Sequence, residues 1–412
     1  MSTESFISNM NKWHTPLKWI RLGIISFLIV AILGAIMRYK IGFSLPYFNQ
    51  KYLQHAHSHF AFSGWISQVL WAWIAYNIGG ATFLGTKKIQ ILLLSHFMVA
   101  IGMLISFTIQ GYGVISIIFS SASIITSIFL VVELYNKSNL SQKTAGTLWY
   151  KASFLWFIVS TVGTFWLIIM MIQKNIPQHA YLSSIYGYLH FQYNGWFFFA
   201  CTGILLQFLE KNELLVEQHS LKKSWLILSL TCIPAYGLSI LWLNLPIYLY
   251  TIVAIAATFQ LLGWIHLLKQ IHVKAFLIRL SKIQKTLLVA LVCTVSLKFT
   301  LQSLSVIPAV SQLAFGIRPI VIAYLHLVLL GIISLFIIFQ ATLENWIKQG
   351  SVVIAGIIIF LSGFLLNEVT LASQGITSFF YILIPHIEAI LFIASILLVT
   401  GVLLINIGQL KK

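Results

Sequence analysis

The sequence predicts an all-α, polytopic membrane protein with twelve transmembrane helices in three pseudo-repeated four-helix units. Of its 412 residues, 59% are hydrophobic and only 8% are charged, a composition that suits lipid better than water. Apolar stretches of about 20 residues, which is the length needed to cross a bilayer, follow one another along the whole chain. A histidine followed five residues later by a glycine occurs three times at nearly equal intervals, which predicts an internal repeat.

Hydropathy defines the spans. In chain order they are residues 19–37, 54–77, 89–109, 112–133, 150–172, 183–209, 224–243, 246–268, 286–307, 318–341, 351–370 and 379–408. The first span follows a polar segment without a small-residue cleavage pattern, so we expect a spanning helix and no removable signal peptide. Because the connecting loops are short, we expect one membrane domain over 1–412, with pseudo-repeats at 19–133, at 150–243 plus 246–268, and at 286–408.

Charge predicts the orientation of the spans. The chain has 25 Lys and Arg against 8 acids, all of them Glu, and a net charge of +17. With a cytoplasmic N-terminus, nineteen of the basic residues fall on the inner side, so the positive-inside rule predicts that both termini are cytoplasmic. We expect a bacterial inner membrane. The basic residues are scattered among apolar blocks, so we expect membrane lipid as their partner and no nucleic acid.

The composition excludes several mechanisms. Without Asp, the chain lacks the residue required by aspartyl-phosphate ATPases, Walker-B metal sites and EF-hand loops. Three single cysteines in apolar runs predict no disulfide framework, zinc knuckle or covalent haem attachment.

The repeated histidines lie on the second span of each unit. They form the pairs His59–Gly64, His190–Gly195 and His326–Gly331. These spans run inward, so the three imidazoles share a depth of roughly 10 Å below the outer edge. Neutral imidazoles from separate helices at one depth are the ligands that a haem or a copper ion requires. The glycines would allow a flat macrocycle or a neighbouring helix to approach.

Other groups stay open as ligands. His57 and His59 point in opposite directions on a helix, and either could be the ligand on that span. His386, expected at a similar depth in the last span, and Tyr324 are further candidates. For each histidine, a hydrogen bond to a neighbouring helix is the alternative role. We interpret the six that stand alone or in loops as structural: His14, His96, His179, His219, His266 and His272.

Three charged residues are secondary candidates. Glu388 is expected to be an intramembrane carboxylate, for a proton relay or for orienting a ligand. Lys298, inside the ninth span, is expected to extend outward to the interface, with a proton path as the alternative. Arg318 could pair with a haem propionate, and an ordinary interface arginine is the alternative.

Together these motifs resemble subunit I of the haem-copper oxidases, especially the branch with the cytochrome c-accepting oxidases and the nitric oxide reductases. The segment from His59 to Gly64-Trp65 looks like that family's low-spin haem ligand motif. Tyr324-Leu-His326 stands where the family has His-x-His. The resemblance implies three four-helix arcs and a b-type haem held by His59 and His326.

A further segment, Tyr188-Leu-His190 before Asn194-Gly195-Trp196, is similar to the helix that gives one histidine to copper or non-haem iron. The family's other ligands are missing, because Tyr324 replaces the first histidine of its pair and residues 225–243 contain no His-His pair. Retention of one haem, for electron transfer or for sensing a small gas (O2 or NO), is therefore the expectation. A catalytic variant stays open if His190, His57, His386 and Tyr324 assemble a second metal centre.

Two alternatives belong to other classes. One is a haem and copper protein of the nitric oxide response, resembling the NnrS-like proteins. The other is a metal-free secondary transporter, against which the clustering of polar residues toward one face argues. With no soluble domain, any electron donor is expected to be a quinone or a separate cytochrome, and additional membrane subunits are expected partners.

Overall fold

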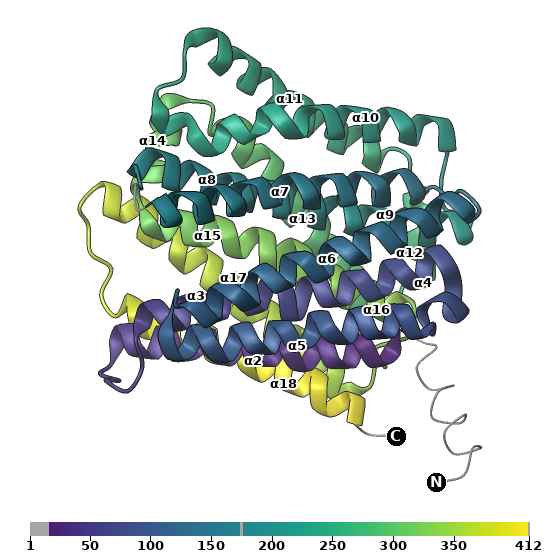
Figure 1. Ribbon diagram of the computed structural model, residues 1–412, viewed down its shortest axis with the longest axis horizontal. Helices are drawn as coiled ribbons and strands as arrows, with labels where there is room; N and C mark the ends of the chain where they lie inside the picture. Colours follow the sequence, from purple (N-terminus) through teal and green to yellow (C-terminus); the bar gives the residue numbers. More distant parts are fainter. Residues whose placement is uncertain (1–15, 174–175, 411–412) are drawn as a thin grey trace. The chain divides into compact units, whose positions relative to one another are not determined.

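The computed structural model describes residues 16–173 and 176–410, and every named element in this part of the chain is helical (Figure 1). The elements are α2 (Leu17–Gly42), α3 (Gln50–Phe60), η1 (Ala61–Ser67), α4 (Gln68–Leu84), α5 (Lys87–Gln110), α6 (Val114–Leu140), α7 (Thr147–Gln173), α8 (Gln178–His190), η2 (Phe191–Phe197), α9 (Phe198–Lys211), α10 (Gln218–Ala235), η3 (Tyr236–Leu243), α11 (Ile247–Leu268), α12 (Val273–Arg279), α13 (Lys282–Leu304), α14 (Pro308–Gly316), α15 (Arg318–Val328), η4 (Leu329–Ser334), α16 (Leu335–Leu343), α17 (Ser351–Phe379) and α18 (Ile387–Leu410). The all-α prediction is confirmed.

Ten helices in the described ranges are long and apolar enough to cross a membrane. They overlap ten of the predicted spans, all except 54–77 and 183–209. A chain with so many apolar helices is a polytopic membrane protein.

The two remaining predicted spans lie in composite helices. Residues 50–84 are helical through α3, η1 and α4, and residues 178–211 are helical through α8, η2 and α9. Both contain His, Gln and Ser side chains that lower their hydropathy, which explains why they fall outside the ten. In the first, a kink at Gly80, with φ 71° and ψ −170°, follows the predicted end of the span, and only glycine adopts this conformation readily.

The prediction for the last span is wrong at its start. Helix α17 continues to Phe379 and α18 begins at Ile387, so the residues between them form a connection and not a helix. Pro385 lies in this connection, and its fixed ring disfavours helical backbone in the preceding residue. Hydropathy does not register this break, because the connection is itself apolar.

The helices form two compact units. Unit 1 comprises 1–142, 340–373 and 383–412, and unit 2 comprises 143–339 and 374–382. Within unit 1, α2 packs along α18, and α5 packs against both α3 and α6. Within unit 2, α10 packs against α11, and α7 packs against α8 and η2.

Small residues allow close helix packing in unit 1. A Cβ added to Gly401 of α18 would lie 2.6 Å from the backbone nitrogen of Phe360 in α17, and one added to Gly356 would lie 2.8 Å from the Gly401 carbonyl oxygen. Glycine at such positions is the usual device for bringing membrane helices together, since lipid supplies no hydrophobic driving force for their association.

Candidate functional site

Three π-helices interrupt the described helices, and each begins within three residues of a repeated histidine. They are η1 after His59, η2 after His190 and η4 after His326. Each contains the glycine of the His-x4-Gly pattern: Gly64, Gly195 and Gly331. A π-helix widens the backbone turn, is rare, and occurs frequently at functional sites. The pattern in the sequence thus coincides with a shared departure from α-helical geometry that the sequence did not predict.

In unit 1, His57 of α3 bonds to helix α2. Its Nδ1 lies 3.0 Å from the carbonyl oxygen of Val30. Because a carbonyl can only accept, Nδ1 carries the proton and Nε2 holds the lone pair of the neutral ring. Gly34, one helical turn after Val30, lies against the same imidazole, and a Cβ added there would be 3.4 Å from His57 Cε1.

His59 has a different environment. Its Nε2 lies 2.9 Å from the hydroxyl oxygen of Tyr112, and its ring is stacked on Phe107 at 4.2 Å between centroids. Tyr112 follows Gly111, whose φ of +60° forms the turn between α5 and α6. His55 also packs edge-on against Tyr112. His59 therefore belongs to an aromatic cluster, and its Nε2 is engaged there.

A buried polar chain follows deeper in unit 1. His96, which is 1% exposed, lies 2.7 Å through Nδ1 from Gln68 Oε1 and 3.4 Å through Nε2 from Ser63 Oγ. Both ring nitrogens have partners, which agrees with the structural role expected for His96. The ring of Phe60 fills the space beside Gly64, and a Cβ added to Gly64 would lie 2.3 Å from it. In this arrangement the missing side chain of Gly64 makes room for Phe60, which precedes it by one helical turn.

In unit 2, His190 is 1% exposed and uses both ring nitrogens. Nε2 lies 2.9 Å from the carbonyl oxygen of Cys232, and Nδ1 lies 3.0 Å from Asn194 Nδ2. The ring therefore donates through Nε2 and accepts at Nδ1. In this arrangement neither nitrogen offers a lone pair to a metal.

The backbone around Pro234 explains the partner of His190. The N–H of Tyr236 bonds to the carbonyls of Ile233 and Pro234 as α10 passes into the 3₁₀-helix η3. The carbonyl of Cys232 therefore lacks the bond from the fourth following residue that it would receive in a continued α-helix. His190 donates to that carbonyl.

The expectation that Lys298 extends to the interface is wrong. Its side chain on α13 is 3% exposed, and Nζ lies 3.8 Å from the ring centroid of Phe299 and 5.6 Å from that of Phe198. An aromatic face compensates part of the cost of burying such a cation, so Lys298 stays inside unit 2.

The remaining candidates of unit 2 lie on α15. Tyr324 and His326 are half-buried, and Arg318 is exposed at the first position of the helix. The ring of Tyr324 lies 6.1 Å from that of Tyr193, edge to face. The carbonyl of Gly331 accepts a 2.7 Å hydrogen bond from Thr294 of α13.

The acidic and C-terminal candidates are placed differently from the prediction. His386 is exposed, has φ +56° and precedes α18, so it does not lie within the span. Glu388 lies in the first turn of α18 beside Gly42 at the end of α2, and so at a span end.

Glu368 lies inside α17, where its Oε1 accepts a 3.0 Å hydrogen bond from Asn367. Sequence reasoning did not identify Glu368 as a candidate, although an acid within the apolar stretch 351–370 is a visible signal.

Three of the six histidines interpreted as structural, His96, His179 and His266, make side-chain contacts. His266 lies 2.7 Å from Ser224 Oγ and 3.3 Å from Ser220 Oγ, and His179 stacks on Trp242. His272 is exposed before α12. His14 and the side chain of His219 lie outside the described part.

Within the described ranges, no group of three or more His, Cys, Asp or Glu side chains gathers as a metal ion would need. An axially held haem needs only two ligands. No protein-family model matches the chain, and no curated protein matches it either. The resemblance to the haem-copper oxidases thus rests on the sequence motifs alone.

Proposed function

We propose that this chain is a membrane haem protein that uses a b-type haem for one-electron transfer or for sensing a small gas. The observation that carries the proposal is the hydrogen bond from His57 Nδ1 to the carbonyl of Val30. A haem-ligating histidine typically donates its other ring N–H to a carbonyl or carboxylate, which orients the ring and raises its basicity. His57 has this arrangement, and Nε2 is left to act as the ligand.

This assignment selects between the two histidines that the sequence left open. His59 Nε2 is engaged with Tyr112 and its ring is covered by Phe107, so it would have to leave both to bind iron. His57, which lies against Gly34, could bind iron through Nε2 while it keeps its hydrogen bond to Val30. We therefore assign the ligand of α3 to His57 and a supporting role to His59.

In the proposal, His326 of α15 would supply the other imidazole that holds the haem, an assignment that only the resemblance implies. Arg318, on the exposed end of the same helix, is the candidate partner for a propionate. A haem with two imidazole ligands would exchange single electrons and have no open position for a substrate, so a small gas could be sensed only by displacing one imidazole. The three π-helices beside His59, His190 and His326 support the twelve-span, threefold-repeat architecture that belongs to this proposal.

A second metal at His190 receives less support. His190 would have to break two buried hydrogen bonds, to Cys232 and Asn194, and the exposed His386 would have to move from its connection. We therefore place one haem at the centre of the proposal. The expected donor is a quinone or a separate cytochrome in a bacterial inner membrane, with both termini cytoplasmic.

The test is a reduced-minus-oxidised visible spectrum of the detergent-purified full chain, expressed with ample haem, alongside His326→Ala. The proposal expects sharp low-spin b-type bands at about one haem per chain, and their loss in the variant. His272→Ala, which removes an exposed histidine, should keep the bands. A colourless protein would reject haem binding and make transport the leading function.

A further inference from the structure

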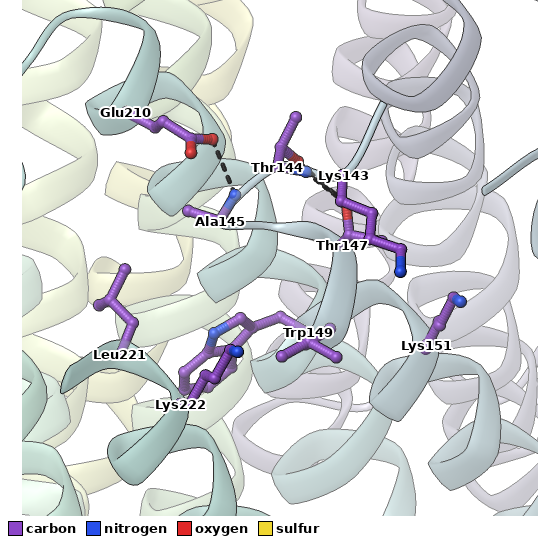
Figure 2. A pocket seen from close by; sticks show the side chains of 10 residues that line it. Lys143, Thr144, Ala145, Thr147, Trp149, Lys151, Glu210, Leu221 and Lys222 are labelled. Atoms are coloured by element: carbon purple, nitrogen blue, oxygen red, sulfur yellow. Dashed lines mark hydrogen bonds between the residues drawn. The ribbon is translucent and has the colours of Figure 1, made fainter. Parts of the chain in front are cut away.

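Unit 2 contains a basic pocket of about 540 Å³ formed by the segment before α7, the start of α7, the end of α9 and the start of α10 (Figure 2). Three lysines from different elements line it, Lys143, Lys151 and Lys222, together with one acid, Glu210. The pocket therefore holds an excess of two positive charges, which favours an anionic occupant.

The wall of the pocket is ordered by its own hydrogen bonds. Glu210 Oε2 accepts a 2.7 Å bond from the backbone N–H of Ala145, and Thr147 Oγ1 accepts a 2.8 Å bond from the N–H of Thr144. Figure 2 shows these bonds in the segment that leads into α7. The carboxylate thus anchors the segment that carries Lys143. Trp149, 1% exposed, forms an apolar part of the lining.

Exposed apolar residues continue from the pocket along the two helices that carry lysines. They recur every three or four residues, as expected for one helix face. On α10, Lys222 is followed by Leu226, Leu230 and Ile233. On α7, Lys151 is followed by Leu155, Ile158 and Val162. These six apolar side chains are between 37% and 66% exposed. The two helices contact one another. A basic pocket continuous with two apolar stripes has the polarity of a phospholipid, with the phosphate at the lysines and the acyl chains along the helices.

We propose that this pocket binds a phosphate group, supplied by an anionic phospholipid. The lysines belong to segments that the charge pattern places on the cytoplasmic side, and basic pockets between membrane helices on that side suit anionic headgroups. Free inorganic phosphate shares the chemistry of the headgroup but would make no use of the apolar stripes. The inference is independent of the haem proposal.

The test compares lipid retention by the full chain in mixed micelles, using native mass spectrometry with phosphatidylglycerol or phosphatidylcholine at equal mole fraction. The double variant Lys143→Gln/Lys222→Gln removes two exposed charges from the pocket. The matched control, Lys282→Gln/Lys285→Gln, removes two exposed charges from α13. A third arm adds inorganic phosphate as competitor.

The wild type and the control should retain phosphatidylglycerol in preference to phosphatidylcholine. The pocket variant should lose affinity by about fivefold for each lysine removed. Displacement of the lipid by millimolar phosphate, with phosphate binding that depends on the same lysines, would identify a soluble phosphate as the occupant. Equal losses in the pocket variant and the control, or no preference for the anionic lipid, would overturn the proposal.

Discussion

His57 and Val30 are joined by a hydrogen bond of 3.0 Å between Nδ1 of the imidazole and the carbonyl oxygen of the neighbouring helix. This bond links α3 to α2 and sets the ring orientation. It also gives Nε2 the lone pair that a ligand needs. Two histidines of the His-x4-Gly repeat, His59 and His190, have Nε2 engaged in hydrogen bonds. The proposed haem function depends on this difference.

Gly34 tests the support of His57. Because the ring lies against Gly34, Gly34→Leu should push the imidazole away from Val30 and lower haem affinity by roughly 10- to 100-fold, as loss of an outer-shell partner typically does. Haem content of the purified variant measures this. Gly34→Ala, whose methyl group would be in ordinary contact with the ring, should retain most of the haem. Equal haem content in the leucine variant and the wild type would show that Gly34 does not contribute to the haem site.

The hydrogen bonds of His190 predict a structural role. Asn194→Ala leaves a buried ring nitrogen without its donor and should lower the free energy of unfolding by about 1–3 kcal/mol. Haem bands should remain unchanged. Denaturant unfolding in detergent measures the first effect and the visible spectrum the second, with His272→Ala as the neutral control. If Asn194→Ala instead lost metal or haem at unchanged stability, the result would indicate that His190 is a ligand that Asn194 orients.

Lys298 separates the effect of charge from that of volume. Lys298→Met keeps the long stem but removes an ammonium that is expensive to bury, against a cation–π gain of about 2 kcal/mol. We expect the methionine variant to unfold with a free energy at least equal to that of the wild type. Lys298→Ala, which leaves a cavity, should lose about 2–5 kcal/mol. Equal destabilisation by both substitutions would mean that the ammonium makes a required polar contact.

Gly195 tests the close approach of η2 to α7. A Cβ at this position would lie 2.4 Å from Trp156 Cβ, which neither side can relieve without a backbone shift. Gly195→Ala should therefore cost about 1–3 kcal/mol of stability through overpacking. Gly350→Ala, with nothing within 4 Å of the added Cβ, is the matched control and should be close to neutral. A tolerated Gly195→Ala would remove the steric reason for glycine here.

The sequence predicted the features that depend on local pattern. Helical spans follow from apolar runs. The His-x4-Gly repeat could be read from the sequence, but the π-helices that coincide with it could not. The sequence left His57 and His59 open, because the hydrogen bond that distinguishes the two rings is to the carbonyl of Val30, 27 positions before His57. Lys298 was misplaced for a similar reason, since its burial depends on Phe198 of another helix. His386 was misplaced because hydropathy gives no weight to the break at Pro385.

The most direct test of the account compares His57→Ala with His59→Ala in the reduced-minus-oxidised visible spectrum of the purified full chain. Both variants remove one imidazole from the same helix, so each is the control for the other. The account predicts that low-spin b-type bands disappear in His57→Ala and remain in His59→Ala. Bands that survive in His57→Ala and vanish in His59→Ala would contradict it.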